Sequence, residues 1–159
     1  MELVMNEYKT RVLLVEDEEL ARKTLSFYLN TIFDEVQVAC DGEEGIKLYK
    51  EQNFDLVLTD IRMPNKDGIT MIDEMLEIVS DQRFIIVSAY KNEEDLLKLI
   101  NLKVLGYFVK PLNIDDMMSM LEKAKKELLA DKVGQDKKDS DEIVKLNKTY
   151  SYKKGRNIL

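Results

Sequence analysis

Two apolar stretches of this chain run straight into carboxylates. The stretch 11–15 is followed by the acidic group 16–19, and the stretch 54–59 is followed by Asp60. Both are close to continuously apolar, which is typical of strands buried on both faces of a parallel sheet. Because the carboxyl ends of parallel strands meet at one edge, we expect these acidic side chains to gather where open α/β sheets bind ligands.

The alternation of apolar runs with amphipathic segments predicts the fold class. Five strands alternating with helices indicate an α/β protein with a doubly wound, five-stranded parallel sheet. The turn signals Asp41-Gly42 and Asp67-Gly68 stand at the start of two predicted helices. We expect strands at about 11–15, 35–39, 54–59, 84–88 and 106–109, and helices at about 18–30, 43–51, 67–78, 92–102 and 113–130.

The texture of the sequence changes after Ala130, which divides the chain into a domain at 1–130, a linker at 131–141 and a tail at 142–159. The linker is polar and poor in apolar residues. The tail contains β-branched and aromatic residues that look strand-like. Its role stays open between the truncated start of an effector domain, a dimerisation segment that pairs or docks, and a partly disordered extension.

Composition limits the chemistry. The 159 residues include no His and one Cys. The lack of His excludes His-based zinc sites and Ser-His or Cys-His catalysis, so any phosphohistidine must come from another protein. Cys40 cannot form an internal disulfide and is expected to be a small buried residue after a strand. The net charge of −7 makes the chain a poor match for nucleic acid. Without a signal peptide or a span-length apolar run, a cytoplasmic protein with no membrane association is expected.

Asp60 is the candidate nucleophile for phosphoryl transfer. A carboxylate that attacks phosphorus is repelled by the phosphate oxygens, and a metal ion and fixed cations reduce that repulsion. Glu16 and Asp17 are placed to hold Mg²⁺, which favours carboxylate, water and phosphate oxygens. Lys110 and Ser88 stand at two further strand ends and offer a cation and a hydroxyl. Taken singly, each of these residues is explained as a helix cap, a turn residue or a surface residue. Only their occurrence together at successive strand ends favours a site.

Six stretches of the sequence follow one another in order: VLLVEDE at 12–18, DGEE at 41–44, DLVLTDIRMP at 55–64, DG at 67–68, VSAY at 87–90 and GYFVKP at 106–111. Together they resemble, from residue 11 to about 128, the receiver domain of bacterial two-component response regulators. In that family the fold is a flavodoxin-like (βα)5 sheet. The resemblance implies that Asp60 takes a phosphoryl group from the phosphohistidine of a sensor histidine kinase.

The resemblance also implies which residues act. Asp17 and Asp60 would bind Mg²⁺ directly, Glu16 would act mainly through a water molecule, and the backbone carbonyl of Arg62 would complete the protein ligands. In addition, Arg62 and Tyr90 occupy the two positions that tune the loss of phosphate in the family. Because both are bulky and could hinder the attacking water, we expect a fairly long-lived phosphoryl state.

The phosphoryl group itself would be bound by Lys110 and Ser88, with Ala89 beside it. The family pattern further implies a switch, in which Ser88 moves toward the phosphate and Tyr107 rotates into the vacated space. This would reshape the 92–130 surface, as a small change of charge biases a two-state element. A static, half-buried ring is the alternative interpretation of Tyr107.

The output is expected to be control of transcription. The tail faintly resembles the first strands of winged-helix effector domains, but DNA binding would require an effector domain beyond this chain. A homodimer through the 92–130 face or the C-terminal tail is a further expected partner. A stand-alone regulator acting by protein contacts is the main alternative.

Two other classes of function share parts of the pattern. A Mg²⁺-dependent aspartyl phosphatase normally has a second acid two residues after its nucleophile, where this chain has Arg62. A flavodoxin-type electron carrier is disfavoured because the acidic group 16–19 would repel a flavin phosphate. We therefore expect no enzyme activity beyond self-phosphorylation and autodephosphorylation.

Overall fold

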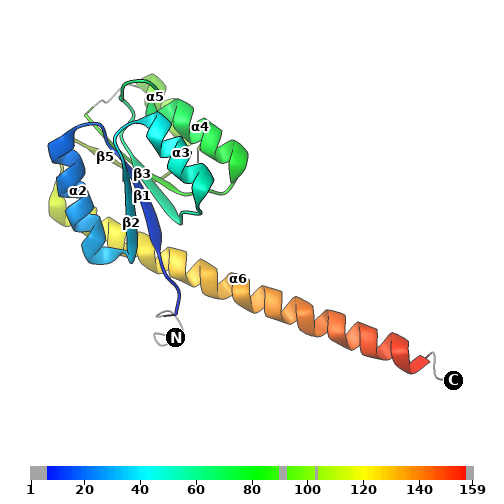
Figure 1. Ribbon diagram of the computed structural model, residues 1–159. Coiled ribbons are helices and arrows are strands. Elements are labelled where there is room, and N and C mark those ends of the chain that lie inside the picture. Colours follow the sequence, from blue (N-terminus) through cyan, green and yellow to red (C-terminus); the bar gives the residue numbers. More distant parts are fainter. Residues whose placement is uncertain (1–6, 90–92, 103, 157–159) are drawn as a thin grey trace. The chain divides into compact units, whose positions relative to one another are not determined.

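The computed structural model describes residues 7–89, 93–102 and 104–156. Five strands in this part of the chain form one sheet in which every pairing is parallel, and their order is β2-β1-β3-β4-β5 (Figure 1). This is the flavodoxin-like order, so the predicted fold class is confirmed. The strands are β1 (Arg11–Val15), β2 (Glu35–Ala39), β3 (Leu56–Thr59), β4 (Phe84–Ser88) and β5 (Val104–Val109).

Helices connect successive strands, and short polar side chains begin three of them. Asp41 and Asp67 accept hydrogen bonds from the backbone N–H groups of Glu44 and Thr70, at 2.8 and 2.9 Å. Asn113 begins the last helix in the same way. Such caps satisfy N–H groups that lack a partner within the helix. The helices are α2 (Glu19–Ile32), α3 (Gly42–Glu51), α4 (Gly68–Ile78), α5 (Glu93–Ile100) and α6 (Ile114–Arg156).

Helices cover both faces of the sheet. Side chains of a strand alternate between the faces. Leu13, Val57 and Ile86 point to the face covered by α3 and α4, where they form one buried cluster with Ile72. The opposite face is covered by α2, as Figure 1 shows, and by the first turns of α6. The Lys125 ammonium links these two helices by donating to the carbonyl of Ile32 at 2.5 Å. Buried residues on that side include Val12, Leu14, Leu25, Leu29, Met117 and Leu121.

The C-terminal region corrects the sequence prediction. Residues 131–141 are helical instead of forming an irregular linker, and no strand occurs in the described part of the tail, because α6 continues to Arg156. A strand needs a neighbouring strand to satisfy its backbone groups, whereas a helix satisfies them internally. Local contacts also support the helix: Gln135 donates to Asp139 at 2.9 Å, one turn away.

The chain divides into two compact units, one at Lys9–Lys125 and the other comprising Met1–Tyr8 with Lys126–Leu159. In the second unit the Tyr8 hydroxyl donates to the Asp136 carboxylate. All described candidate site residues fall in the first unit. No helix in the part of the chain that the structure describes is both long and apolar enough to cross a membrane.

Cys40 is exposed, which corrects the expectation that it is buried. It follows β2 at the edge of the sheet, in the turn that leads into α3. Its backbone N–H donates to the carboxylate of Glu44 at 2.7 Å, so the turn is held by a polar contact at the surface. The small size of Cys40 is therefore not needed for packing.

Candidate functional site

The backbone brings four strand ends to one edge of the sheet. The N–H of Asp60 donates to the carbonyl of Val15, the last residue of β1, at 3.1 Å, which continues the β1–β3 ladder one residue past the end of β3. The N–H of Lys110 donates to the carbonyl of Ser88 at 3.0 Å and continues the β4–β5 ladder in the same way. The peptide bond between Lys110 and Pro111 is cis. The sequence prediction that acid, hydroxyl and cation follow adjacent strands is therefore confirmed in the backbone.

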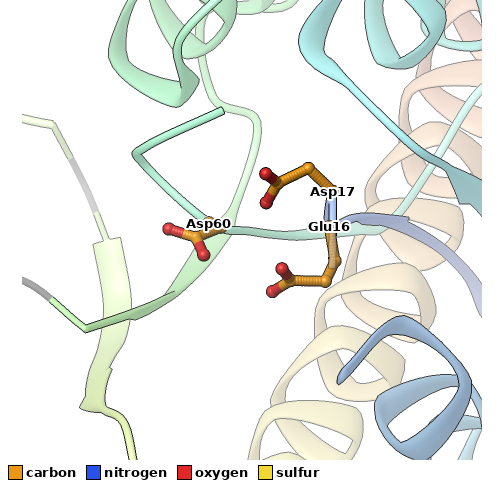
Figure 2. Close-up of side chains that lie close together, drawn as sticks. All are labelled: Glu16, Asp17 and Asp60. Atoms are coloured by element: carbon orange, nitrogen blue, oxygen red, sulfur yellow. The ribbon is translucent and has the colours of Figure 1, made fainter. Parts of the chain in front are cut away.

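Three carboxylates lie together at this edge. One oxygen from each of Glu16, Asp17 and Asp60 lies within 4.8 Å of the others. Figure 2 shows Glu16 and Asp17 projecting beside Asp60 from consecutive positions of the chain. Glu16 is 1% exposed and Asp60 is 6% exposed, whereas Asp17 faces solvent. The site thus holds two buried carboxylates and has one open side.

Lys110 faces both buried carboxylates. Its Nζ lies 2.9 Å from Glu16 Oε2 and 2.9 Å from Asp60 Oδ2. Burial raises the pKa of Glu16, although the bond from Lys110 opposes that shift. Burial by itself lowers the pKa of Lys110, but its bonds to Asp60 and Glu16 more than offset this, so the pKa is raised. Lys110 is therefore held in its charged form beside Asp60.

The second oxygen of Asp60 is held by the backbone. Asp60 Oδ1 accepts the N–H of Ile61 at 2.6 Å and the N–H of Arg62 at 3.2 Å. One oxygen is thus bound by two amides and the other by an ammonium group. These contacts fix the orientation of the Asp60 carboxylate before any ligand arrives. Such preorganisation favours reaction at Asp60.

These residues fit a divalent cation. The Lys110 ammonium pairs with two of the three carboxylates, so negative charge remains uncompensated if all three are ionised. Two oxygens bound to one Mg²⁺ lie at most about 4 Å apart, because each sits roughly 2.1 Å from the metal. A spacing within 4.8 Å is compatible with a cation bound directly by all three carboxylates, and with one in which a single carboxylate, as expected for Glu16, acts through water. The Arg62 carbonyl lies in the loop that follows Asp60.

Ser88 and Tyr107 share one face of the sheet. Ile86 pairs with Tyr107 and Ser88 pairs with Val109, so Ser88 and Tyr107 are diagonal neighbours across β4 and β5. Ser88 is completely buried. Tyr107 is half-buried and packs against the core cluster. This arrangement is the one that coupled movement of the two side chains requires, and it equally accommodates a static ring.

The remaining predicted residues lie at the surface or outside the described chain. Ala89 is exposed directly after β4. The side chain of Arg62 is exposed, while its backbone N–H reaches Asp60. Tyr90 lies outside the described residues.

Sequence reasoning missed Arg22. Its guanidinium Nη1 donates to the backbone carbonyls of Glu16 at 3.0 Å and Asp17 at 3.1 Å. Arg22 lies on α2 and so fixes the turn that presents both carboxylates. The only signal in the sequence is an arginine one turn into the helix that follows the acidic group, and this is too common a pattern to single out.

Comparison with known proteins identifies the family. The family model described as the response regulator receiver domain matches residues 12–122. The chain belongs to this family. Every described residue of the acid cluster, together with Ser88 and Lys110, falls within the matched segment of the receiver domain.

Similar proteins include both long and short regulators. The receiver is 34% identical over 117 residues to a probable C4-dicarboxylate response regulator of Bacillus subtilis, a match covering 72% of this chain and 52% of that protein. It is 33% identical over 111 residues to the chemotaxis protein CheY of Halobacterium salinarum, covering 70% of this chain and 92% of that protein. The chain thus spans about half the length of the first relative and nearly all of the second.

A solved structure shows the same fold. The N-terminal domain of an uncharacterized protein from Wolinella succinogenes is 34% identical in sequence and superposes with a TM-score of 0.72. The match covers 77% of this chain and 98% of that domain. This chain is therefore a receiver domain of the two-component response regulators in sequence and in fold.

Proposed function

We propose that this receiver accepts a phosphoryl group on Asp60 from the phosphohistidine of a sensor histidine kinase, in a Mg²⁺-dependent reaction. The observation that carries the proposal is the environment of Asp60, a buried carboxylate oriented by two backbone amides and by Lys110 at 2.9 Å. Glu16 and Asp17 supply two further carboxylate oxygens that lie within 4.8 Å of each other and of an oxygen of Asp60. The reaction would take place in the cytoplasm.

The transfer is a substitution at phosphorus. An oxygen of Asp60 forms a new P–O bond while the P–N bond to the donor imidazole breaks, and the leaving imidazole takes up a proton. When bound, Mg²⁺ neutralises negative charge shared between the carboxylates and the phosphoryl oxygens. Lys110 stays charged beside Asp60 and compensates a second phosphoryl oxygen. The hydroxyl of Ser88 is the proposed donor to a third.

The output is proposed to pass through the surface formed by residues 92–130. Recruitment of Ser88 by the phosphoryl group would let Tyr107 change its position, since both lie on one face of β4 and β5. The similarity to a longer response regulator supports control of transcription, with DNA contacted through an effector domain. The similarity to a CheY protein supports the second candidate, a stand-alone regulator that acts by protein contact. A homodimer through the 92–130 face or through the C-terminal tail is compatible with either.

We do not propose an enzyme that acts on external phosphomonoesters. Such an enzyme needs a general acid near the nucleophile, and the residue two positions beyond Asp60 is Arg62. Arg62 contacts Asp60 by its backbone N–H, and its side chain carries no carboxyl group that could act as a general acid. Multiple turnovers of phosphomonoester hydrolysis would favour the phosphatase instead.

The decisive experiment is mass spectrometry after incubation with acetyl phosphate and Mg²⁺. The wild-type protein should gain one phosphoryl group, and Asp60→Asn should gain none. Asp55→Asn is a matched control, because Asp55 directly precedes β3, at the opposite end from Asp60, and its carboxylate accepts the N–H of Arg11 at 2.8 Å. Asp55→Asn should be modified like wild type. A folded wild-type protein that remains unmodified with metal and phosphodonor present would overturn the proposal.

A further inference from the structure

The loop at 61–67 follows Asp60 and contains the Arg62 carbonyl, and it is held where α4 begins. The N–H of Gly68, the first residue of α4, donates to the carbonyl of Ile61 at 2.7 Å. A Cβ at Gly68 would collide with the carbonyl oxygen of Asp60 and would lie 2.9 Å from the Cα of Ile61. The start of α4 therefore packs directly against the backbone of the phosphoacceptor.

A second helix start contacts the other end of the same loop. Gly42 is the first residue of α3, which follows β2 and is distant in sequence from the loop. A Cβ at Gly42 would collide with the carbonyl oxygen of Lys66 and would lie 3.0 Å from the Cβ of Lys66. Only a residue without a side chain allows α3 to approach the loop this closely.

Asp41 joins the same contact through both of its carboxylate oxygens. Oδ1 accepts the N–H of Glu44 and caps α3, at 2.8 Å. Oδ2 accepts the side-chain amide of Asn65, at 3.1 Å. Asn65 has a φ of 67°, in the left-handed region that Asn tolerates better than most residues. One side chain thus fixes both the helix start and the conformation of the loop.

The loop has little freedom between these contacts. The carbonyl of Lys66 is pressed against α3, while its ammonium group pairs with Glu74 on α4 at 2.5 Å. The side chain of Lys66 is only 21% exposed. A shift of α3 relative to the loop would therefore be passed along the backbone toward Arg62 and Ile61 and would not be absorbed by a flexible side chain.

We infer that Asp41, Gly42 and Asn65 are positioning residues that set the place of the 61–67 loop and, through it, the affinity of the site for Mg²⁺. The inference rests on the proposed function, since it concerns the metal that would assist phosphorylation of Asp60. Mg²⁺ demands near-octahedral geometry, so a small displacement of a ligand atom weakens binding. Contacts that orient metal ligands are typically worth about 10- to 100-fold in affinity.

Gly42→Ala tests the steric part of the inference. Alanine favours helix more than glycine does, so a loss of metal binding could not be assigned to a weaker α3. We expect the Mg²⁺ dissociation constant to rise by about tenfold. Gly134→Ala is the matched control, because no heavy atom lies within 4 Å of a Cβ built at Gly134. Binding is followed by the amide NMR shifts of Ile61 and Arg62 during titration with MgCl₂.

The polar part is tested by a double-mutant cycle of Asp41→Ser and Asn65→Gly. Serine still caps the helix but has a single side-chain oxygen, and glycine keeps the left-handed backbone without the amide. Each single variant should weaken Mg²⁺ binding severalfold. The double variant should bind Mg²⁺ with about the affinity of whichever single variant binds it less tightly. Independent, additive losses of affinity would contradict coupling between the two side chains.

The amide shifts of Ile61 and Arg62 in metal-free protein provide a separate readout. If the contact positions the loop, these shifts move in Gly42→Ala and stay unchanged in Gly134→Ala. Normal shifts and normal Mg²⁺ affinity in Gly42→Ala would overturn the inference and leave the proposed function intact. If the wild-type protein binds no Mg²⁺, the proposed function fails with the metal part of the inference, while the metal-free shifts still decide whether the contact positions the loop.

Discussion

Lys110 Nζ lies 2.9 Å from Asp60 Oδ2, and this ion pair joins the ends of two strands that are not adjacent in the sheet, β3 and β5. The same ammonium group also reaches Glu16 beyond β1. The side chain of Lys110 is 20% exposed, while those of Glu16 and Asp60 are 1% and 8% exposed. Lys110 therefore acts as the common counter-ion of two buried carboxylates, and the metal-free site depends on it.

Replacing Lys110 by glutamine should destabilise the metal-free protein. Two largely buried carboxylates would lose the ammonium group that pairs with both of them, and loss of one member of a buried ion pair is costly. We expect the free energy of unfolding to fall by about 1–3 kcal/mol, less than for a fully buried pair because Lys110 is partly exposed. Urea unfolding in the presence of a chelator measures the change.

Lys23→Gln is the control for loss of a lysine charge. Lys23 pairs with Glu19 at 2.7 Å, but both side chains are at least 70% exposed. Such surface pairs contribute at most about 0.5 kcal/mol on a helix. Equal effects of Lys110→Gln and Lys23→Gln would show that the buried pair is no more important than a surface pair.

Asp17→Asn should abolish stabilisation by Mg²⁺ without harming the metal-free fold. Asp17 faces solvent, so its substitution should change the metal-free free energy of unfolding by less than about 0.5 kcal/mol. At a Mg²⁺ concentration 100 times the dissociation constant, wild type should gain about 2.7 kcal/mol. Thermal unfolding with and without MgCl₂ separates the two effects. Asp73 is exposed on α4, and the control variant Asp73→Asn should respond to Mg²⁺ as wild type does. A normal Mg²⁺ response in Asp17→Asn would exclude Asp17 as a ligand.

Most of the sheet could be predicted from the sequence because buried parallel strands leave a strong apolar signal. The bounds of β1, β2 and β4 are as predicted. β3 begins at Leu56 instead of residue 54, although the backbone N–H of Asp55 already donates to the carbonyl of Arg11 at 2.8 Å. β5 begins at Val104 instead of residue 106, and the β4–β5 register shifts at this end of the pair. Periodicity does not reveal such irregularities.

The acid cluster was predictable because residue type and strand position coincide at Glu16, Asp17 and Asp60. Contacts made by the connecting segments were not. Arg22 reaches backbone carbonyls, and Asn65 reaches Asp41 from a turn 24 residues away in sequence, so neither contact leaves a local pattern. The prediction of strand-like structure in the tail was wrong for a different reason. Strand-like residues after position 142 had no partner strand, and the chain continues as helix.

Asp34 should make stability depend on pH in the acid range. The backbone N–H of Thr10 donates to its carboxylate at 2.7 Å and the Thr10 hydroxyl at 2.8 Å, and these bonds hold the pKa of Asp34 below its ordinary value of 3.8. A depressed pKa means that the stabilisation is complete above the ordinary value and is lost as the pH falls through the lower, folded value.

Asp34→Asn tests this dependence, because Asn keeps an acceptor and removes the charge. At neutral pH the free energy of unfolding of wild type should exceed that of the variant by about 1 kcal/mol. The difference is modest because Asp34 is mostly exposed. The difference should shrink as the pH falls below 3.8. Urea unfolding at several pH values gives the comparison. A difference that stays constant across this range would mean that the charge of Asp34 does not matter.

Ser88→Ala should separate phosphorylation from switching. Asp60 keeps its orientation from Ile61, Arg62 and Lys110, so the variant should still gain a phosphoryl group from acetyl phosphate. Without the hydroxyl, the ring of Tyr107 should not change its environment on phosphorylation, whereas it should in wild type. NMR of ring-labelled tyrosine measures this, with Tyr107→Phe identifying the signal. An unchanged Tyr107 signal in phosphorylated wild type would instead support a static ring.

The phosphoryl group on Asp60 should be long-lived, and Arg62 should contribute to its lifetime. The exposed side chain of Arg62 lies two residues beyond the acceptor, where its bulk can hinder the water that hydrolyses the acyl phosphate. Arg62→Ala should therefore shorten the lifetime severalfold, which separation of phosphorylated from free protein over time would measure. Arg83 lies directly before β4, at the amino-terminal end of the strand and so away from the site. Arg83→Ala should leave the lifetime unchanged. A wild-type lifetime of only seconds would contradict shielding by a bulky residue. A similar shortening by both substitutions would show that the effect of Arg62 is one of overall stability.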